Sequence, residues 1–266
     1  MGIDRSRRIT FEEVADLYDQ VRPGYPEALV DDVLALAGIP PGGRILEIGC
    51  GPGNATLLFA RRGYRIIAVE LGERLAALAA KNCRAYPGVE IHNMAFEDWP
   101  TEEDAFDLAI AADAFHWIPP EIGYPKVARA LKDGGSAAFF WYVPVDPGTD
   151  WSRAIDAVYR ERAPGVGNPD HSFTLDWVRP IIEGNFAATG CFGPVTVKAY
   201  RWSETYSGEQ YLKMLRTFSG HRDLAAETRE ALFAGIRDVL ERAGGQVTKP
   251  QMVALFQARV TKLRRR

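Results

Sequence analysis

Short aliphatic and β-branched runs alternate with amphipathic stretches through the first half of the chain. The runs show little polar alternation, which is typical of strands buried on both faces. They cover residues 44–50, 65–71, 89–96, 106–112 and 136–143, and the amphipathic stretches between them cover 54–62, 73–84 and 121–131. Strands that alternate with helices of this length predict an α/β fold of βαβ units, with a mostly parallel, doubly wound sheet.

Two helices are predicted before the first strand. Thr10-Phe11-Glu12-Glu13 has the spacing of a capping box, and the apolar residues after it fall on one helical face. Pro23-Gly24 ends that helix, and Pro26 can begin a second one that ends at Gly38. We expect these helices to form an N-terminal cap segment.

The pattern changes after Pro144, where loops rich in proline and glycine flank a predicted helix at residues 151–162. Further along, residues 195–206 and 252–260 have strand character, and residues 222–243 form a long amphipathic stretch. We therefore predict a single domain over residues 1–266. It comprises a helical cap segment at 1–39, a core at 40–143, and the remaining sheet with helical cap insertions at 144–266.

Composition and charge narrow the class of protein. The 266 residues are 47% hydrophobic and 25% charged, and the net charge of −3 gives no general attraction to nucleic acid or an anionic membrane. Cys50, Cys83 and Cys191 lack disulfide or metal-ligand spacing, which suits a reducing cytosol. The N-terminus has no signal-peptide core, and no apolar run approaches the roughly 20 residues that span a bilayer. We expect a cytoplasmic protein without a bound metal.

The sharpest signal is Ile45–Asn54, where a predicted strand passes through three closely spaced glycines into a helix. Glycines let the backbone approach a ligand closely, and the helix start adds unsatisfied N–H donors. Dinucleotide folds prefer Gly-x-Gly-x-x-Gly/Ala, but the sixth position here is Asn54 and the third glycine is Gly53. Glu47, at the carboxyl end of the strand, would repel a pyrophosphate but can accept a hydrogen bond from an ammonium group. The loop therefore favours a cationic cofactor without phosphate.

A second acidic residue follows the next predicted strand. Glu70 lies roughly 20 residues beyond the glycines, where an acidic side chain can accept hydrogen bonds from ribose hydroxyls. That role serves dinucleotides and adenosyl cofactors alike, and a solvated loop carboxylate is the alternative. Glu70 therefore supports an adenosine-containing cofactor without choosing between the two classes.

Glu-x-Gly-x-Gly-x-Gly after an aliphatic strand resembles the first motif of class I S-adenosylmethionine-dependent methyltransferases. Further stretches are similar to small-molecule members such as trans-aconitate methyltransferase and the "type 11" group; they are residues 11–19, 22–26, 96–99, 114–117 and 129–135. The similarity extends over about residues 11–143. Its first motif is fairly specific, and the later ones are specific mainly in combination.

The resemblance implies a seven-stranded, mostly parallel sheet whose last strand is antiparallel, with S-adenosyl-L-methionine as the cofactor and S-adenosyl-L-homocysteine as its product. It implies that the methionine part of the cofactor contacts Glu47, Gly49, Gly51 and Gly53. Glu70 and Leu71 are expected to contact the ribose and adenine. Ala112 is expected to lie where the fourth strand opens over the cofactor.

The same resemblance places Ala95 and Phe96 at the adenine edge. Members of the family often have Asp where Ala95 stands, so the adenine amine is held here either by backbone or by Glu97. Tyr18 and Arg22 are expected to close the site from the N-terminal cap, Arg22 by pairing with the cofactor carboxylate.

Methyl transfer needs a general base only when the nucleophile carries a proton of high pKa. His116 follows the fourth predicted strand at the carboxyl edge of the sheet, where open α/β folds place their chemistry, and is the candidate base. A structural histidine beside Trp117 is the alternative. Tyr18, Trp141 and Tyr142 are either acceptor-pocket residues or core aromatics.

We therefore predict transfer of a methyl group from S-adenosylmethionine to oxygen or nitrogen of a small organic acceptor. A nucleotide-dependent oxidoreductase, a binding relative without turnover and a nucleic-acid methyltransferase are the alternatives. Asn54 and Glu47 count against the first. The lack of an Asn-Pro-Pro-Tyr motif after the fourth strand counts against the last. The pattern identifies neither the acceptor nor the oligomeric state.

Overall fold

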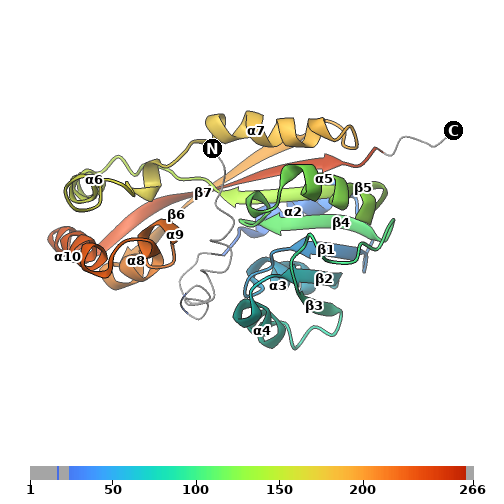
Figure 1. The fold of residues 1–266 in the computed structure, drawn as a ribbon, viewed down its shortest axis with the longest axis horizontal. Coiled ribbons are helices and arrows are strands. Elements are labelled where there is room, and N and C mark those ends of the chain that lie inside the picture. Colours follow the sequence, from blue (N-terminus) through green and yellow to red (C-terminus); the bar gives the residue numbers. More distant parts are fainter. Residues whose placement is uncertain (1–16, 18–23, 262–266) are drawn as a thin grey trace.

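The computed structural model describes residue 17 and residues 24–261, and a seven-stranded sheet forms their centre (Figure 1). The strand order is β3-β2-β1-β4-β5-β7-β6. The strands are β1 (Arg44–Ile48), β2 (Arg65–Glu70), β3 (Val89–Asn93), β4 (Phe106–Ala112), β5 (Leu131–Tyr142), β6 (Thr196–Ser207) and β7 (Gln246–Arg259). β1 to β5 pair in parallel, whereas β7 runs antiparallel to both of its neighbours. The predicted mostly parallel sheet with an antiparallel last strand is confirmed.

Both faces of the sheet are buried. Phe139 belongs to the apolar cluster on one face and Phe140 to the cluster on the other, because consecutive strand residues point to opposite sides. The first face packs against α5 (Pro120–Ala130) and α7 (Leu175–Ala188). The second packs against α2 (Glu27–Ala37), α3 (Asn54–Ala60) and α4 (Glu73–Asn82). This two-sided burial explains why the strands read as near-continuous apolar runs.

Beyond the carboxyl ends of β4 and β5, β6 and β7 continue as a two-stranded ribbon that carries the cap helices (Figure 1). β7 pairs with β5 only as far as Val253 opposite Tyr142, whereas its pairing with β6 continues to Gln246 opposite Ser207. A third apolar cluster joins the ribbon to α6 (Asp150–Arg162), α8 (Gly208–Leu215) and α10 (Ala226–Arg242). The helical cap predicted after Pro144 is therefore present.

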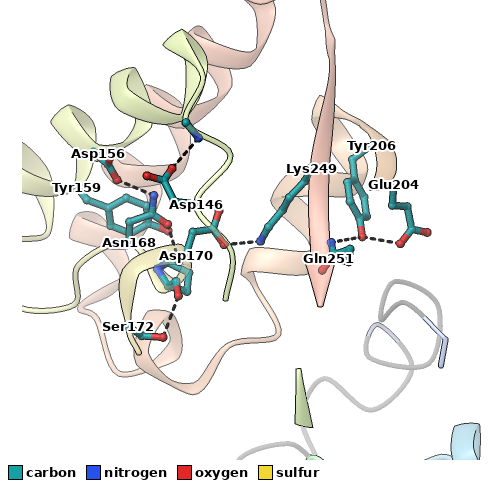
Figure 2. Close-up of polar contacts among 12 residues, drawn as sticks. Asp146, Asp156, Tyr159, Asn168, Asp170, Ser172, Glu204, Tyr206, Lys249 and Gln251 are labelled. Atoms are coloured by element: carbon teal, nitrogen blue, oxygen red, sulfur yellow. Dashed lines mark hydrogen bonds and ion pairs between the residues drawn. The ribbon is translucent and has the colours of Figure 1, made fainter. Parts of the chain in front are cut away.

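The ribbon begins earlier in β7 than the sequence pattern indicates. The pattern predicts the last strand from residue 252, whereas β7 begins at Gln246. Lys249 forms a buried ion pair with Asp170, and Gln251 Nε2 donates to Tyr206 Oη at 2.9 Å (Figure 2). Because these polar side chains are satisfied inside the cap, the strand lacks the apolar pattern by which it would be recognised.

One further helix and two further element boundaries differ from the sequence prediction. α7 is not predicted, because Pro180 and Gly184 interrupt its helical pattern. β5 begins at Leu131, ahead of the turn predicted at residues 133–135. α10 begins at Ala226 rather than at residue 222, since α9 (Ser219–Arg222) is a separate short helix. The helix predicted from residue 11 to 18 lies outside the described residues, apart from residue 17.

Candidate active site

An open pocket lies at the carboxyl ends of β1, β2, β4 and β5, the edge at which open α/β sheets bind ligands. Seven of the residues predicted to bind the cofactor line it: Gly49, Gly51, Glu70, Leu71, Ala95, Phe96 and Ala112. Glu47 and Gly53, which were also predicted to bind the cofactor, and His116, the predicted base, do not line it. Tyr18 and Arg22 lie outside the described residues. The structure thus brings most of the predicted set together around one cavity.

The glycine loop, residues 49–53, presents bare backbone to this pocket. Gly49 has a φ of 68°, and a Cβ built on it would lie 2.5 Å from a neighbouring side-chain carbon, so no other residue fits there. Gly51 has a φ of 56° and open space around its Cα. Gly53, with a φ of 94°, is the N-cap of α3. The left-handed backbone and the missing side chains together allow a ligand to approach closely.

Glu70, the last residue of β2, ties the glycine loop to the sheet. Its Oε2 accepts a hydrogen bond from the N–H of Gly51 and its Oε1 accepts one from the N–H of Gly72, both at 2.8 Å. Asn93 Nδ2 donates to the backbone oxygens of Glu70 and Leu71 at 3.0 Å each. A carboxylate offers about four acceptor positions, so ribose hydroxyls can share this side chain with the loop.

Glu47 is fully buried next to the glycine loop and is not exposed in the pocket. Neither carboxylate oxygen has a hydrogen-bond partner; the hydroxyl of Thr56 lies close but makes no bond of normal geometry. Burial raises the pKa of Glu47 to about 8, Thr56 opposes the rise in part, and the charge of Glu70 adds to it. A buried acid without a partner is costly unless a positive charge lies near it. The side chain therefore fits a loop that binds a cation.

Comparison with known proteins agrees with this geometry. Residues 45–135 match the family described as "Methyltransferase domain". An uncharacterized methyltransferase of Mycobacterium tuberculosis is 29% identical over 155 residues, 58% of this chain and 60% of that protein. A 23S rRNA (uracil(1939)-C(5))-methyltransferase of Acidithiobacillus ferrooxidans is 33% identical over 170 residues, 62% of this chain and 38% of that protein. The chain thus spans less than two thirds of the length of these curated relatives.

A solved structure shares the fold. It is phosphoethanolamine N-methyltransferase 2 of Haemonchus contortus, in complex with phosphomonomethylethanolamine and S-adenosylhomocysteine; the TM-score is 0.56 at 16% identity, over 94% of this chain and 58% of that one. The chain therefore matches a methyltransferase domain over residues 45–135 and has the fold of the class I S-adenosylmethionine-dependent methyltransferases. The similarity to the trans-aconitate methyltransferase group stays a prediction.

The described residues fit S-adenosylmethionine, the cofactor of this class. The open space at Gly51 admits the methionine part, and the buried carboxyl group of Glu47 lies beside that loop. Glu70 and Leu71 line the pocket where ribose and adenine are predicted to bind. β3 ends at Asn93, so the predicted adenine-edge residues lie in the loop after it, where Glu97 also lines the pocket. The individual contacts stay predictions.

His116 is placed differently from what its predicted role as a base requires. Its Nδ1 accepts a hydrogen bond from Trp141 Nε1 at 3.1 Å. In the neutral ring the proton therefore sits on Nε2. This nitrogen is then a hydrogen-bond donor and has no free lone pair with which to take a proton from the methyl acceptor. Desolvation of the ring lowers the pKa of His116 to about 4, although the residue as a whole is exposed to solvent. The structure adds no support to catalysis by His116, and the role stays a prediction.

The pocket also contains residues that the sequence analysis did not assign to it. They are Tyr25, Asp113, Trp117 and Ile118, together with several residues of the loop and of α3 and α4. Tyr25 belongs to the N-terminal motif at residues 22–26, and Asp113 directly follows β4. Asp113 shares with Glu47 and Glu70 the sequence signal of an acidic residue at or near the end of a parallel strand.

The charged residues described in the pocket wall are all acidic. Among the described residues, the wall contains the carboxyl groups of Glu70, Glu97 and Asp113 and no Lys, Arg or His. The same described part of the chain has no group of three or more His, Cys, Asp or Glu side chains arranged to hold a metal ion. The predicted absence of a metal stays a prediction.

Proposed function

We propose that this protein transfers a methyl group from S-adenosylmethionine to nitrogen or oxygen of a small organic acceptor. The observation that carries the proposal is the bare glycine loop at the sheet's carboxyl edge, held by Glu70 and backed by the unpartnered, buried Glu47. The cofactor supplies a methyl group on a positively charged sulfur. The acidic side chains at the glycine loop attract that positive charge. They would repel the pyrophosphate of a dinucleotide, which disfavours such a nucleotide as the cofactor.

The chain contributes alignment and exclusion of water. Holding two reactants in line can supply about 7–11 kcal/mol of the barrier reduction. The glycine loop fixes the donor side of the pocket, and Tyr25, Trp117 and Tyr142 form aromatic surfaces elsewhere in its wall. In the transfer the acceptor's lone pair forms the new bond to the methyl carbon. The carbon–sulfur bond breaks with its electron pair left on sulfur, and any acceptor proton passes to solvent.

A small acceptor is favoured over RNA. Proteins that bind RNA or DNA neutralise phosphates with Lys and Arg, whereas the described pocket wall contains no such residue. The similarity to the rRNA enzyme covers 38% of that protein and leaves most of it without a counterpart in the chain. In the described part of the chain, no helix is long and apolar enough to cross a membrane. We propose a cytoplasmic enzyme.

Two measurements test the proposal in order. Calorimetric titration should show binding of S-adenosylmethionine and S-adenosylhomocysteine and no binding of NAD. Small amines, phenols, carboxylic acids and a structured RNA are then incubated with the protein, and release of S-adenosylhomocysteine is followed. Turnover on RNA alone would replace the small-molecule proposal, and binding of NAD in place of the adenosyl compounds would overturn methyl transfer itself.

A further inference from the structure

Asp113 joins three segments of the chain at the pocket wall. Its Oδ2 accepts a hydrogen bond from Tyr25 Oη at 2.9 Å, and its Oδ1 accepts one from the backbone N–H of Tyr142 at 2.9 Å. The N–H of Asp113 itself donates to the carbonyl oxygen of Phe140 at 2.9 Å. One side chain therefore links the segment before α2 to the ends of β4 and β5.

The backbone of Asp113 is left-handed, with a φ of 53°. Among the described residues, one other non-glycine residue has a positive φ, Asp104 at 54°. This conformation is unfavourable for residues with a side chain, persists where the surroundings enforce it, and is found disproportionately at functional sites. Asp104 lies two residues before β4 and Asp113 lies directly after it. Asp113 is thus a candidate functional residue at one end of β4, and Asp104 near the other end is a control with a similar backbone conformation.

Tyr25 and Tyr142, together called the aromatic wall, both line the pocket. Their ring centroids are 5.4 Å apart, and Tyr25 packs edge-on against Phe140 at 4.9 Å. Tyr25 Oη donates to Asp113, and Tyr142 Oη donates to the carbonyl oxygen of Gly24 at 2.6 Å. Because a phenol hydroxyl has one proton, these bonds use the donors of both hydroxyl groups. Recognition by the wall therefore depends on its rings and not on a hydroxyl donor.

We propose that Asp113 is a positioning residue that holds the aromatic wall as the recognition surface for an amine acceptor. The inference rests on the proposed function and deepens it. During transfer to an amine, the nitrogen lone pair forms the carbon–nitrogen bond, the carbon–sulfur pair stays on sulfur, and the positive charge moves to nitrogen. Aromatic ring faces attract such a cation, and the carboxylate of Asp113 has the complementary charge.

Cation recognition can be measured separately from cofactor binding. The protein, saturated with S-adenosylhomocysteine, is titrated with choline and, in parallel, with 3,3-dimethylbutan-1-ol, an uncharged molecule of the same shape. Choline is expected to bind roughly three- to thirtyfold more tightly than the alcohol, the range typical of attraction between a cation and aromatic rings. Equal binding of the two probes, or tighter binding of the alcohol, overturns the proposal.

Variants test whether the preference for choline over the uncharged alcohol depends on Asp113. Asp113→Ala is expected to abolish the preference for choline while S-adenosylhomocysteine still binds. Asp113→Asn retains an acceptor oxygen and tolerates left-handed backbone, so it should restore the part of the preference that depends on the position of the wall, but not the part due to the carboxylate charge. Tyr25→Phe keeps the ring, removes one hydrogen bond and should give an intermediate result. Asp104→Ala, with matched backbone strain, should behave as the wild type.

One result would contradict the positioning role of Asp113, and a different result would contradict the proposed methyl transfer. An unchanged preference for choline in both Asp113→Ala and Tyr25→Phe shows that Asp113 does not position the wall. Failure of the wild-type protein to bind S-adenosylhomocysteine shows instead that the proposed function itself is wrong. The first result leaves cofactor binding intact, so the two failures are distinguishable.

Discussion

Glu70 is the last residue of β2 and Glu47 the last but one of the neighbouring strand β1, and the two have different tasks. Glu70 forms two hydrogen bonds to backbone N–H groups and thereby holds the glycine loop. Glu47 is buried without a partner, and its raised pKa follows from that burial. Their presence at the site was predictable from strand ends and glycine spacing. Which of them reaches the pocket was not, because that depends on how the loop packs against α3.

Gly51→Val should abolish cofactor binding with only modest destabilisation. The open space around Gly51 is part of the pocket, so a side chain there displaces the ligand without clashing in its absence. Left-handed backbone at a β-branched residue costs about 1–3 kcal/mol. Gly42→Val is the control: Gly42 has a φ of 69°, open space around it, and lies before the opposite end of β1. Calorimetry should show wild-type affinity for the control and no detectable binding for Gly51→Val. A loss of affinity smaller than about tenfold, which is about 1.4 kcal/mol, would contradict the prediction.

The unliganded protein should lose stability relative to Glu47→Gln as the pH rises. The pKa of Glu47 is raised from 4.5 to about 8, so the folded state holds this proton more tightly than the unfolded state does. Its contribution is full below pH 4.5 and is lost as the pH rises through about 8. Urea denaturation of both proteins at intervals across this range measures the difference. A constant difference would show that Glu47 does not titrate there.

S-adenosylmethionine should bind more tightly as the pH rises toward 8. Its sulfonium charge stabilises the ionised form of Glu47, so binding is favoured by loss of the proton. S-adenosylhomocysteine lacks that charge and should show a shallower dependence. In Glu47→Gln the pH dependence of the two ligands should become the same. Parallel titrations of both ligands decide the matter, and identical slopes in the wild type would contradict the coupling.

At the scale of elements, the ribbon of β6 and β7 connects the sheet to the cap. The existence of its two strands was predictable, because residues 195–206 and 252–260 have strand character. The extension of β7 to Gln246 was not, since Lys249 and Gln251 are polar and find their partners only in the folded cap. α7 was missed because Pro180 and Gly184 interrupt it, although packing against the sheet stabilises that helix.

The ion pair between Lys249 and Asp170 should be essential for the cap but replaceable as a pair (Figure 2). The two side chains are 9% and 4% exposed, so Lys249→Met leaves a buried carboxylate without its cation. Such a change typically costs about 3–5 kcal/mol. Adding Asp170→Asn removes the stranded charge and should recover most of that loss. Chemical denaturation of the wild type, the single variant and the double variant measures it; a single-variant loss below about 1 kcal/mol would show that the pair is not needed.

At the scale of the whole molecule, the apolar residues that the structure describes form three clusters rather than one. Two cover the faces of the sheet, and the third joins α6, α8 and α10 to the ribbon. Alternation of strands and helices predicted the parallel half of this architecture. The antiparallel direction of the last strand followed from the resemblance to the methyltransferase family. Its place between β5 and β6 was not predicted, because periodicity does not specify strand order.

Because the cap has its own apolar cluster, ligand binding to the sheet core should not change hydrogen exchange in the cap. The pocket wall contains no described residue of α6, α8 or α10, so S-adenosylhomocysteine should slow hydrogen exchange at residues 49–57 and 69–75. Amides of α10, which belong to the cap cluster, should exchange at an unchanged rate. Mass spectrometry of exchanged peptides, with Gly51→Val as the control that binds no ligand, makes the comparison. Equal protection of α10 and the glycine loop would mean that cap and core open as one cooperative unit, and the three clusters would then act as a single core.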